Sequence, residues 1–426
     1  MAWSQLSLTR VLLLTLLTGA HAAENADKKA GLASEEIVKK TVYTGNATVP
    51  VLSSPPTDKW WKSKTCSGSY CVYTNLRVAK GRGIALVTKE VEFQKVERIE
   101  DHLNRADNKW EDDGSMITQT EVLEKGPGLT ATKKLRRGKS LSSFSPVLLV
   151  HKDLFDDIVK KKERSRLLEA AINYLPDETR EVFNKQRQRP GYPPGEKPRS
   201  IEEILYSHPF EIDLGAGYRQ EHSSKHFINY PEVAAFQHDC RPNVAWYIDQ
   251  NMQHRTTVAR KVAEGEELAI AYIDPMMPRK RRSEWVKRHR GFGKEPKGCP
   301  CQACTHKNKP TLQRQSDKNM EEIEKIKSEL RNHDSQKVTV EMIDKFIKLF
   351  EEERLNAKYA EAYELAALNY NYLGEDKKAK KYADLAVQAG IVEGGKDSND
   401  VIAMKIMASD IKGHYSYRFT LKRRGQ

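Results

Sequence analysis

Long apolar runs are scarce in this sequence of 426 residues. The clearest one, residues 11–17, is much shorter than the ~20 apolar residues that a membrane span requires. No second long apolar run follows it, so the sequence predicts no membrane span. Aromatic residues are also few, with 11 Phe, 17 Tyr and 6 Trp, and no stacking platform for single-stranded nucleic acid is evident among them.

Acidic residues are outnumbered by basic ones, 59 Asp and Glu against 72 Lys and Arg, which gives a formal net charge of +13. This balance favours acidic partners such as nucleic acid or anionic surfaces; the alternative is a well-solvated basic surface without a specific acidic partner. A hydrophobic fraction of 38% and a charged fraction of 31% are typical of a soluble, polar globular protein. The length allows two or three domains of roughly 100–200 residues each.

The first 22 residues have the pattern of a secretory signal peptide. Arg10 provides a weak positive charge, residues 11–17 form a short apolar core, and Ala20-His21-Ala22 supplies small residues at a cleavage site. The alternative is a short apolar helix that is never cleaved. Residues 23–60 are polar and contain three prolines, which predicts a flexible lead-in. The glycosylation sequon at Asn46 is useful only if the chain enters the endoplasmic reticulum.

The six cysteines fall into two groups. Cys66 and Cys71 flank a turn at Gly68 and could pair in an oxidising compartment; otherwise they are two free thiols. The other four lie in the second half of the chain, and three of them form a Cys-x-Cys-x-x-Cys cluster at 299–304. This tight spacing suits a metal site better than internal disulfides, although disulfides remain the alternative.

Two short strands are predicted at 72–78 and 84–87, on either side of Gly81-Arg82-Gly83. Two glycines allow a tight turn and a close approach of the backbone to a ligand, but alone they are more typical of an ordinary β-turn. Residues 100–145 are charged and lack a clear period, which predicts a poorly packed insertion or loop.

The rest of the chain shows clearer periods. Residues 151–175 have helical spacing of apolar residues, and 244–248 and 256–262 alternate as strands do. Residues 320–410 are predicted to be helical, with apolar stripes. Within them, 363–386 resembles one tetratricopeptide repeat, with Gly374 near the turn; the alternative is an ordinary helical hairpin, since an array needs about three repeats.

Four segments in order resemble the SET domain of protein-lysine methyltransferases. They are the Gly81-Arg82-Gly83 turn, Gln237-His238-Asp239-Cys240-Arg241-Pro242-Asn243, the Gly265-Glu266-Glu267-Leu268 turn followed by Tyr272, and the cysteine cluster. The resemblance covers roughly residues 66–305. Relatives split by a MYND finger need about eight Cys or His ligands for that finger, which this chain lacks, so a fungal-type SET protein without MYND fits best.

The resemblance implies an α+β fold with three parts. These are a β-rich SET domain at 61–275 with a helical insertion at about 100–230, a post-SET zinc cluster at 276–310, and an all-α tetratricopeptide-like module at 320–410.

The resemblance also implies the site residues. Tyr272 would be the catalytic residue, and four thiolates would hold one structural zinc ion: Cys240, Cys299, Cys301 and Cys304. S-adenosylmethionine would be held by Gly81, Arg82, Gly83, His208, Gln237, His238 and Phe292. Three features depart from the family pattern: Gln237 and His208 each replace a usual Asn, and six residues separate Phe292 from the cluster.

The expected function is S-adenosylmethionine-dependent methyl transfer to a lysine of a protein, histone or non-histone. The departures leave a catalytically inactive binding or scaffold protein as the alternative, with a secreted metal or peptide binder as a third reading. An acidic partner or nucleosomal DNA could attract the basic chain, and 279–282 could be a targeting signal or a solvated helix face. The signal peptide points to the secretory pathway, whereas the cofactor and reduced thiolates point to the nucleus or cytoplasm.

Overall fold

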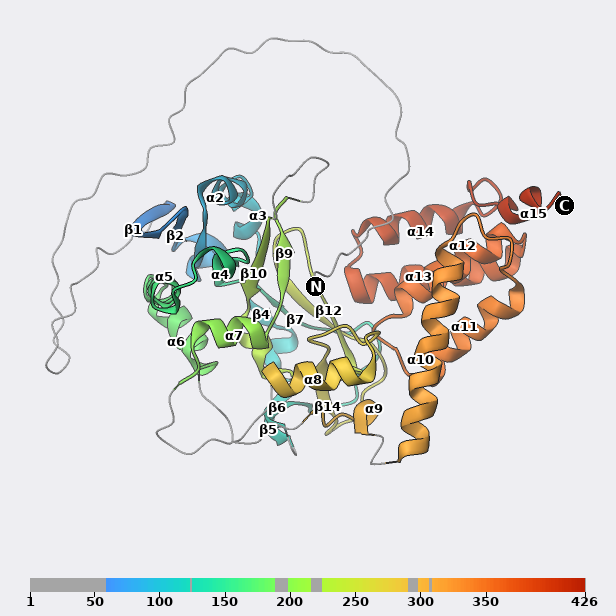
Figure 1. The fold of residues 1–426 in the computed structure, drawn as a ribbon, viewed down its shortest axis with the longest axis horizontal. Helices are drawn as coiled ribbons and strands as arrows, with labels where there is room; N and C mark the ends of the chain where they lie inside the picture. Colours follow the sequence, from blue (N-terminus) through green and yellow to red (C-terminus); the bar gives the residue numbers. More distant parts are fainter. Residues whose placement is uncertain are drawn as a thin grey trace, which may run out of the picture. The chain divides into compact units, whose positions relative to one another are not determined.

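The computed structural model describes residues 59–122, 125–187, 198–215, 224–289, 298–305 and 309–425. The predicted signal peptide, nearly all of the lead-in, the sequon at Asn46 and Phe292 lie outside the described residues. Strands dominate the first part, and only helices follow from Pro310 onward (Figure 1). The α+β class predicted from the sequence is therefore confirmed.

A six-stranded sheet contains both predicted N-terminal strands, although the first ends at Asn75 rather than at Val78. Its order is β1 (Trp61–Ser67), β2 (Tyr70–Asn75), β3 (Ile84–Lys89), β8 (Leu148–His151), β10 (Lys225–Asn229) and β9 (Glu211–Asp213). All neighbours are antiparallel except β3 and β8, which run parallel. Cys66 and Cys71 face each other across the β1–β2 hairpin and form a disulfide, which confirms the predicted pair.

Two four-stranded sheets complete the β-rich part. One has the order β11 (Gln237–His238), β14 (Glu267–Ile270), β6 (Gly126–Ala131) and β5 (Ile117–Val122). The other has the order β12 (Val244–Ile248), β13 (His254–Val258), β7 (Ser140–Phe144) and β4 (Lys109–Trp110). The predicted strand 244–248 is confirmed, and the one predicted at 256–262 begins earlier, at His254, and ends at Val258.

The prediction that 100–145 is a poorly packed loop is wrong. Four strands lie there, and Leu129, Leu141 and Phe144 are buried in the core. Their pattern is weak because β5 is half-exposed and charged residues fill the turns between short strands. The helical insertion predicted at about 100–230 is accordingly narrower: its helices after this region are α4 (Leu154–Asp157), α5 (Lys161–Asn173), α6 (Asp177–Lys185) and α7 (Ile201–Ser207).

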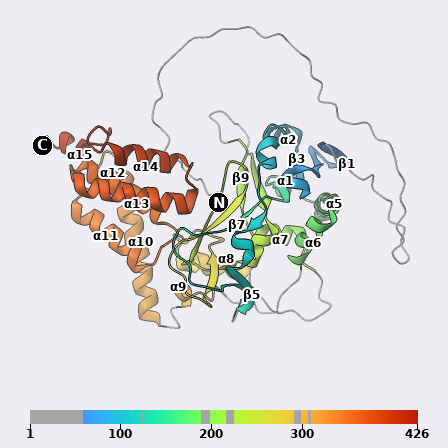
Figure 2. The same ribbon diagram turned by 180° about the vertical axis from the view of Figure 1, so that it is seen from behind.

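Helix α5 packs against β1, β2 and β3, as its apolar stripe requires. Leu168, Ala171 and Ile172 are all buried, which confirms the helical period of this segment. The helix predicted over 151–175 is shorter, because His151 belongs to β8 and the chain is not helical between Asp157 and Lys161. The remaining short elements are α1 (Val78–Gly81), α2 (Glu90–Glu97), α3 (Glu100–Asn104), η1 (Glu111–Gly114), η2 (Pro231–Ala235), α8 (Arg279–His289) and α9 (Gln302–Thr305). Figure 2 shows α2 beside β3.

The C-terminal helices form a module with its own apolar core. They are α10 (Pro310–Arg331), α11 (Val340–Glu352), α12 (Tyr359–Tyr372), α13 (Asp376–Gly394), α14 (Asn399–Ser409) and α15 (Phe419–Arg423). The predicted stripe residues Ile323, Ile326 and Phe346 are buried. Gly374, at φ +74, makes the tight turn between α12 and α13, so the predicted hairpin is confirmed, and its likeness to a tetratricopeptide repeat stays a prediction.

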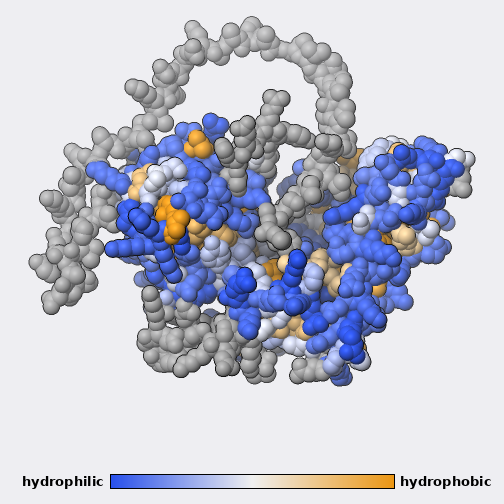
Figure 3. Space-filling model, in the orientation of Figure 1, coloured by the Kyte–Doolittle hydropathy of each residue, from blue (hydrophilic) through white to orange (hydrophobic). Residues whose placement is uncertain are grey.

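In the described part of the chain, no helix has both the length and the apolar content that crossing a membrane demands. The face drawn in Figure 3 is mostly hydrophilic, as expected from a charged fraction of 31%.

Candidate active site and metal centre

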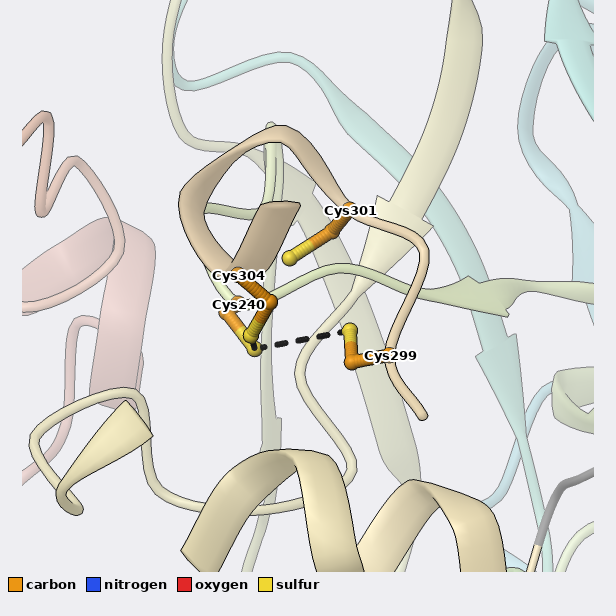
Figure 4. A group of neighbouring side chains, drawn as sticks. All are labelled: Cys240, Cys299, Cys301 and Cys304. Atoms are coloured by element: carbon orange, nitrogen blue, oxygen red, sulfur yellow. Dashed lines mark hydrogen bonds between the residues drawn. The ribbon is translucent and has the colours of Figure 1, made fainter. Parts of the chain in front are cut away.

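Four buried thiols converge at one point (Figure 4). The sulfur of Cys240 lies 3.8 Å from that of Cys299 and 3.5 Å from that of Cys304, and all four sulfurs lie within 4.8 Å of one another. A tetrahedral zinc ion with bonds of about 2.3 Å separates its sulfur ligands by roughly 3.8 Å. All four cysteines are free rather than disulfide-bonded, so this donor set fits a structural zinc ion.

The cysteines come from two distant segments. Cys240 lies in the loop after β11, and the other three lie just before or within the short helix α9. The Cys299 backbone amide donates to the Ser283 hydroxyl of α8 at 3.3 Å, and the Cys304 amide donates to the Cys301 carbonyl. Helix α8 therefore supports the chain that delivers three of the thiols.

Arg282 supplies positive charge to the cluster. It is 1% exposed, and its Nη1 donates to the Pro275 carbonyl at 2.6 Å. Although burial opposes it, the negative charges of Cys240 and the neighbouring thiolates raise the pKa of Arg282. Hydrogen bonds from the other thiols, with help from Arg282, lower the pKa of Cys304. Because four thiolates exceed the charge of one zinc ion, a buried guanidinium stabilises the assembly.

His238 connects the cysteine cluster to Tyr272. Its Nδ1 accepts a hydrogen bond from the backbone amide of Tyr272 at 3.2 Å. The proton of a neutral imidazole then lies on Nε2, which donates to the sulfur of Cys240 at 3.3 Å. A histidine that donates to a metal ligand orients that ligand, so the side chain of His238 has a supporting place beside the cluster.

The loop 239–243 that carries Cys240 is anchored to β14 at both ends. The Asp239 amide donates to the Ile270 carbonyl at 3.0 Å. The Asn243 side chain accepts from the Ala269 amide at 2.9 Å and donates to the Glu267 carbonyl at 2.7 Å. Strands β11 and β14 run parallel here, which brings the two motif segments found in the sequence into contact.

Tyr272 lies just after β14 and is 5% exposed. Its hydroxyl donates toward two carbonyl oxygens, Val233 at 3.0 Å and Phe236 at 3.2 Å. The ring of His208 meets the Tyr272 ring edge-on, with centroids 5.2 Å apart. The phenol oxygen of Tyr272 and the two carbonyl oxygens therefore lie close together as a group of hydrogen-bonding oxygens.

The Gly81-Arg82-Gly83 turn is joined to the same region. Arg82 forms a bidentate ion pair with Glu232 of η2: its Nη1 and Nη2 each lie 2.7 Å from one carboxylate oxygen. Helix η2 leads directly into Phe236 and β11. Gly81 and Gly83 have φ values of +87° and +72°, which favour glycine. A Cβ on Gly83 would also lie 2.9 Å from the Pro176 ring, so both the backbone and the packing require glycine there.

Two residues that depart from the family pattern have structural partners. The Gln237 amide nitrogen donates to the Pro127 carbonyl at 2.6 Å and ties β11 to β6. The Nδ1 of His208 donates to the Ile204 carbonyl at 3.2 Å, which closes the end of α7. Both side chains are buried, and their predicted contacts with S-adenosylmethionine stay predictions.

An aromatic cluster beside Tyr272 was not foreseen from the sequence. The His254 ring is fully buried, stacks on Trp246 at 5.1 Å and meets Phe210 edge-on at 4.7 Å; Phe210 in turn lies 5.5 Å from Tyr272. Burial lowers the pKa of His254 to about 3, so it packs as a neutral ring. The sequence predicted only the strand that carries Trp246; His254 lies just before the strand predicted at 256–262, and Phe210 lies between α7 and β9. No spacing signal linked these three residues to Tyr272.

Residues 126–273 match the family described as SET domain. This matched stretch contains Gln237, His238, Cys240 and Tyr272. This part of the chain is a SET domain.

Two curated proteins share short segments with the chain. A putative SET domain-containing protein of Acanthamoeba polyphaga mimivirus is 35% identical over 95 residues, which is 22% of this chain and 32% of that protein. A SET and MYND domain-containing protein of Dictyostelium discoideum is 38% identical over 56 residues, 13% of this chain and 11% of that protein. The chain thus spans about a third of the first relative's length and about a tenth of the second's.

Proposed function

We propose that the protein transfers a methyl group from S-adenosylmethionine to a lysine of a protein substrate. The observation that carries the proposal is the position of Tyr272: it lies at the end of the matched SET domain, with its hydroxyl among backbone carbonyls. SET proteins are mostly lysine methyltransferases, so we interpret the site as one for methyl transfer. The substrate, histone or non-histone, belongs to the same proposal.

The cofactor supplies a methyl group activated on a sulfonium. A lysine nitrogen that receives this methyl group would have to arrive as the neutral amine and would lose a proton afterwards. A hydroxyl that donates to the Val233 and Phe236 carbonyls presents its own oxygen as an acceptor, which suits Tyr272 to orient the amine N–H. The same oxygens place partial negative charge where positive charge moves in the transition state.

The remaining predicted site residues receive proposed roles. The Gly81-Arg82-Gly83 turn, fixed by Glu232, would line the cofactor pocket together with His208, Gln237, His238 and Phe292. The four thiolates would hold zinc in a closed site, so the ion would shape the fold and would not activate water. The cluster touches the site through His238, which contacts both the Cys240 sulfur and the Tyr272 amide.

The first test is calorimetric titration of residues 23–426 with S-adenosylmethionine, followed by a methyl-transfer screen by mass spectrometry. Tyr272→Phe should lower kcat by about 10²-fold or more while cofactor affinity changes little, because only one positioned hydroxyl is removed. Tyr174→Phe is the matched control: it also removes a buried hydroxyl, one that pairs with Ser63 at 3.0 Å. If the folded, zinc-loaded protein binds no cofactor, the enzyme reading fails and the inactive scaffold replaces it.

An acidic partner is the second part of the proposal. Helix α8 exposes Lys280, Arg281, Lys287 and Arg288, and the described carboxylates form no ion pair with any of them. Their i, i+1, i+7 and i+8 spacing gathers them on one side of the helix. Duplex DNA is the first probe, and the affinity of the protein for it should fall steeply as the salt concentration rises. A variant with all four of these residues replaced by Gln should lose this salt dependence. Unchanged DNA binding by that variant would exclude α8 as the binding surface.

We also propose that the chain enters the secretory pathway. The Cys66–Cys71 disulfide supports this location, because disulfides persist in oxidising compartments. A glycan on Asn46 that an endoglycosidase removes would establish entry to the endoplasmic reticulum. A full-length, unglycosylated pool in the nucleus or cytoplasm would favour the alternative.

A further inference from the structure

A buried ion pair joins the loop that carries Cys240 to the C-terminal helices. The Nη2 of Arg241 lies 2.8 Å from an oxygen of Glu353, and the two side chains are only 5% and 8% exposed. The Nε of Arg241 also donates to the backbone carbonyl of Glu353. Glu353 directly follows α11 as its C-terminal capping residue, and its neighbour Arg354 has φ +53°, so the chain turns sharply there and presents Glu353 to the SET domain.

The Glu353 carboxylate has a full set of donors. One oxygen accepts from Arg241 and from the Ser316 hydroxyl at 2.7 Å, and the other accepts from the Asn319 amide at 3.0 Å. Ser316 and Asn319 lie on α10, so two helices of the module hold the carboxylate. A buried charge with this many partners is fixed in one place, since every alternative position leaves a donor unpaired.

Hydrogen bonds continue from this ion pair to the predicted catalytic residue. Arg241 Nη1 donates to the carbonyl of Cys240 at 2.9 Å. The Cys240 sulfur accepts from His238, which accepts from the Tyr272 amide. An unbroken series of contacts therefore runs from α11 through the metal ligand to Tyr272.

The helical module also contacts the second segment of the cysteine cluster. Arg354 donates to the side chain of Gln302, between Cys301 and Cys304, at 3.1 Å. On α10, Gln313 donates to the carbonyls of Cys304 at 3.3 Å and Thr305 at 2.8 Å. The end of α11 and the start of α10 thus hold both segments that supply the thiols.

We infer that Glu353 and Arg241 are positioning residues: the docked C-terminal module fixes the Cys240 loop, and zinc retention and the placement of Tyr272 depend on this docking. The competing explanation is that the ion pair merely joins the module to the SET domain without consequence for the metal. The effect on zinc stands independently of the proposed methyl transfer, and only the effect on turnover rests on that proposal.

The test compares Glu353→Gln with Glu352→Gln in the full chain loaded with zinc. Glu352 is the neighbouring exposed carboxylate, 3.8 Å from the exposed Lys348, so its loss changes the charge equally without touching the cluster. The readout is the first-order rate of zinc release to an excess of a colorimetric chelator. Glu353→Gln should speed release by about tenfold or more, and Glu352→Gln should leave it unchanged.

Two further variants keep the inference testable if Glu353→Gln does not fold. Arg241→Lys keeps the charge but lacks the fork that reaches Glu353 and the Cys240 carbonyl together, so release should again be faster. Asn319→Ala removes one donor to Glu353 and keeps the ion pair, so a smaller increase is expected. Release within about twofold of wild type in every variant that folds, even with a lower melting temperature, would overturn the inference.

Turnover gives a separate readout. If the wild type transfers methyl groups, Glu353→Gln should lower kcat more than it raises KM for the protein substrate, because Tyr272 loses its position. If the wild type shows no methyl transfer, the proposed function fails, and the zinc-release rates still decide the inference.

Discussion

The two groups of cysteines link the chain in opposite ways. Cys66 and Cys71 are five residues apart, face each other in a hairpin, and are joined by a disulfide. Cys240 meets Cys299 and Cys304 across 59 and 64 residues, and these thiols stay unlinked around a space suited to zinc. The first link closes a loop that the β1–β2 hairpin already closes, whereas the second joins two segments that are far apart in the sequence and are not paired with each other in a sheet.

The difference teaches where covalent and metal links contribute most. A cross-link stabilises by removing freedom from the unfolded chain, and longer loops lose more of it. Around the cluster of four thiols the chain adds Arg282, His238 and the Arg241–Glu353 ion pair, all buried. Around the hairpin disulfide, Cys66 is only partly buried. The long-range link therefore has the stronger support and the larger expected consequences.

Removing zinc is expected to have the largest effect. The thiol cluster joins Cys240 to the chain that precedes α10, so a metal-free protein should lose order in both segments and in the docking of the module. Structural zinc contributes about 10 kcal/mol in small domains, so a loss of several kcal/mol is expected here. Chelation or Cys304→Ser, with metal content checked, should lower the melting temperature by about 10 °C or more. An unchanged transition in demonstrably zinc-free protein would contradict this comparison.

The sequence predicted the parts of the site that lie within short segments. Gln237 to Asn243 and Tyr272 could be recognised because a strand and a turn of fixed length present them together. The helical stripes of α10 and α11 were equally readable, since their apolar residues recur with the helical period and are buried.

The sequence could not predict features set by tertiary contacts. Among the basic residues 279–282, Arg279 pairs with Asp317, Arg282 is buried beside the thiols, and the other two are exposed. No local pattern separates these four. Glu353 meets Arg241 across 112 residues, and β4 pairs with β7, which lies about thirty residues further along. Pairing between residues so far apart in the sequence depends on the folded sheet. The prediction of a loop at 100–145 was wrong for this reason.

Replacing Glu393, which forms a non-covalent link to Arg137, should change the stability of the fold by an intermediate, pH-dependent amount. Glu393, 12% exposed, lies 3.5 Å from Arg137 of the β-rich part and accepts from the backbone amides of Tyr359 and Ala360. Burial raises the pKa of Glu393 from its ordinary 4.5 to about 7. Between pH 4.5 and about 7 the carboxyl of Glu393 holds a proton in the folded state that it has released in the unfolded state. The contribution of Glu393 to the free energy of unfolding therefore falls as pH rises.

Glu393→Gln should therefore gain stability relative to wild type between pH 4.5 and about 7, by at most about 3 kcal/mol, and the difference should level off above that range. Urea unfolding of both proteins at pH 4.5, 6 and 8 gives the three differences directly. Glu352→Gln serves as the exposed control and should show a flat difference. A Glu393→Gln difference that stays constant over the same range would mean that the carboxyl is ionised in the folded state.

Breaking the hairpin disulfide should have the smallest effect. Cys66 and Cys71 close a loop of six residues, for which chain entropy predicts about 2 kcal/mol. The backbone pairing of β1 with β2, and of β2 with β3, remains after the sulfurs are separated. The double variant Cys66→Ser/Cys71→Ser should thus unfold about 2 kcal/mol more easily, while its zinc content and zinc-release rate stay those of the wild type. Loss of zinc from this variant would show that the two groups of cysteines are coupled, and the contrast between a local and a long-range link would no longer hold.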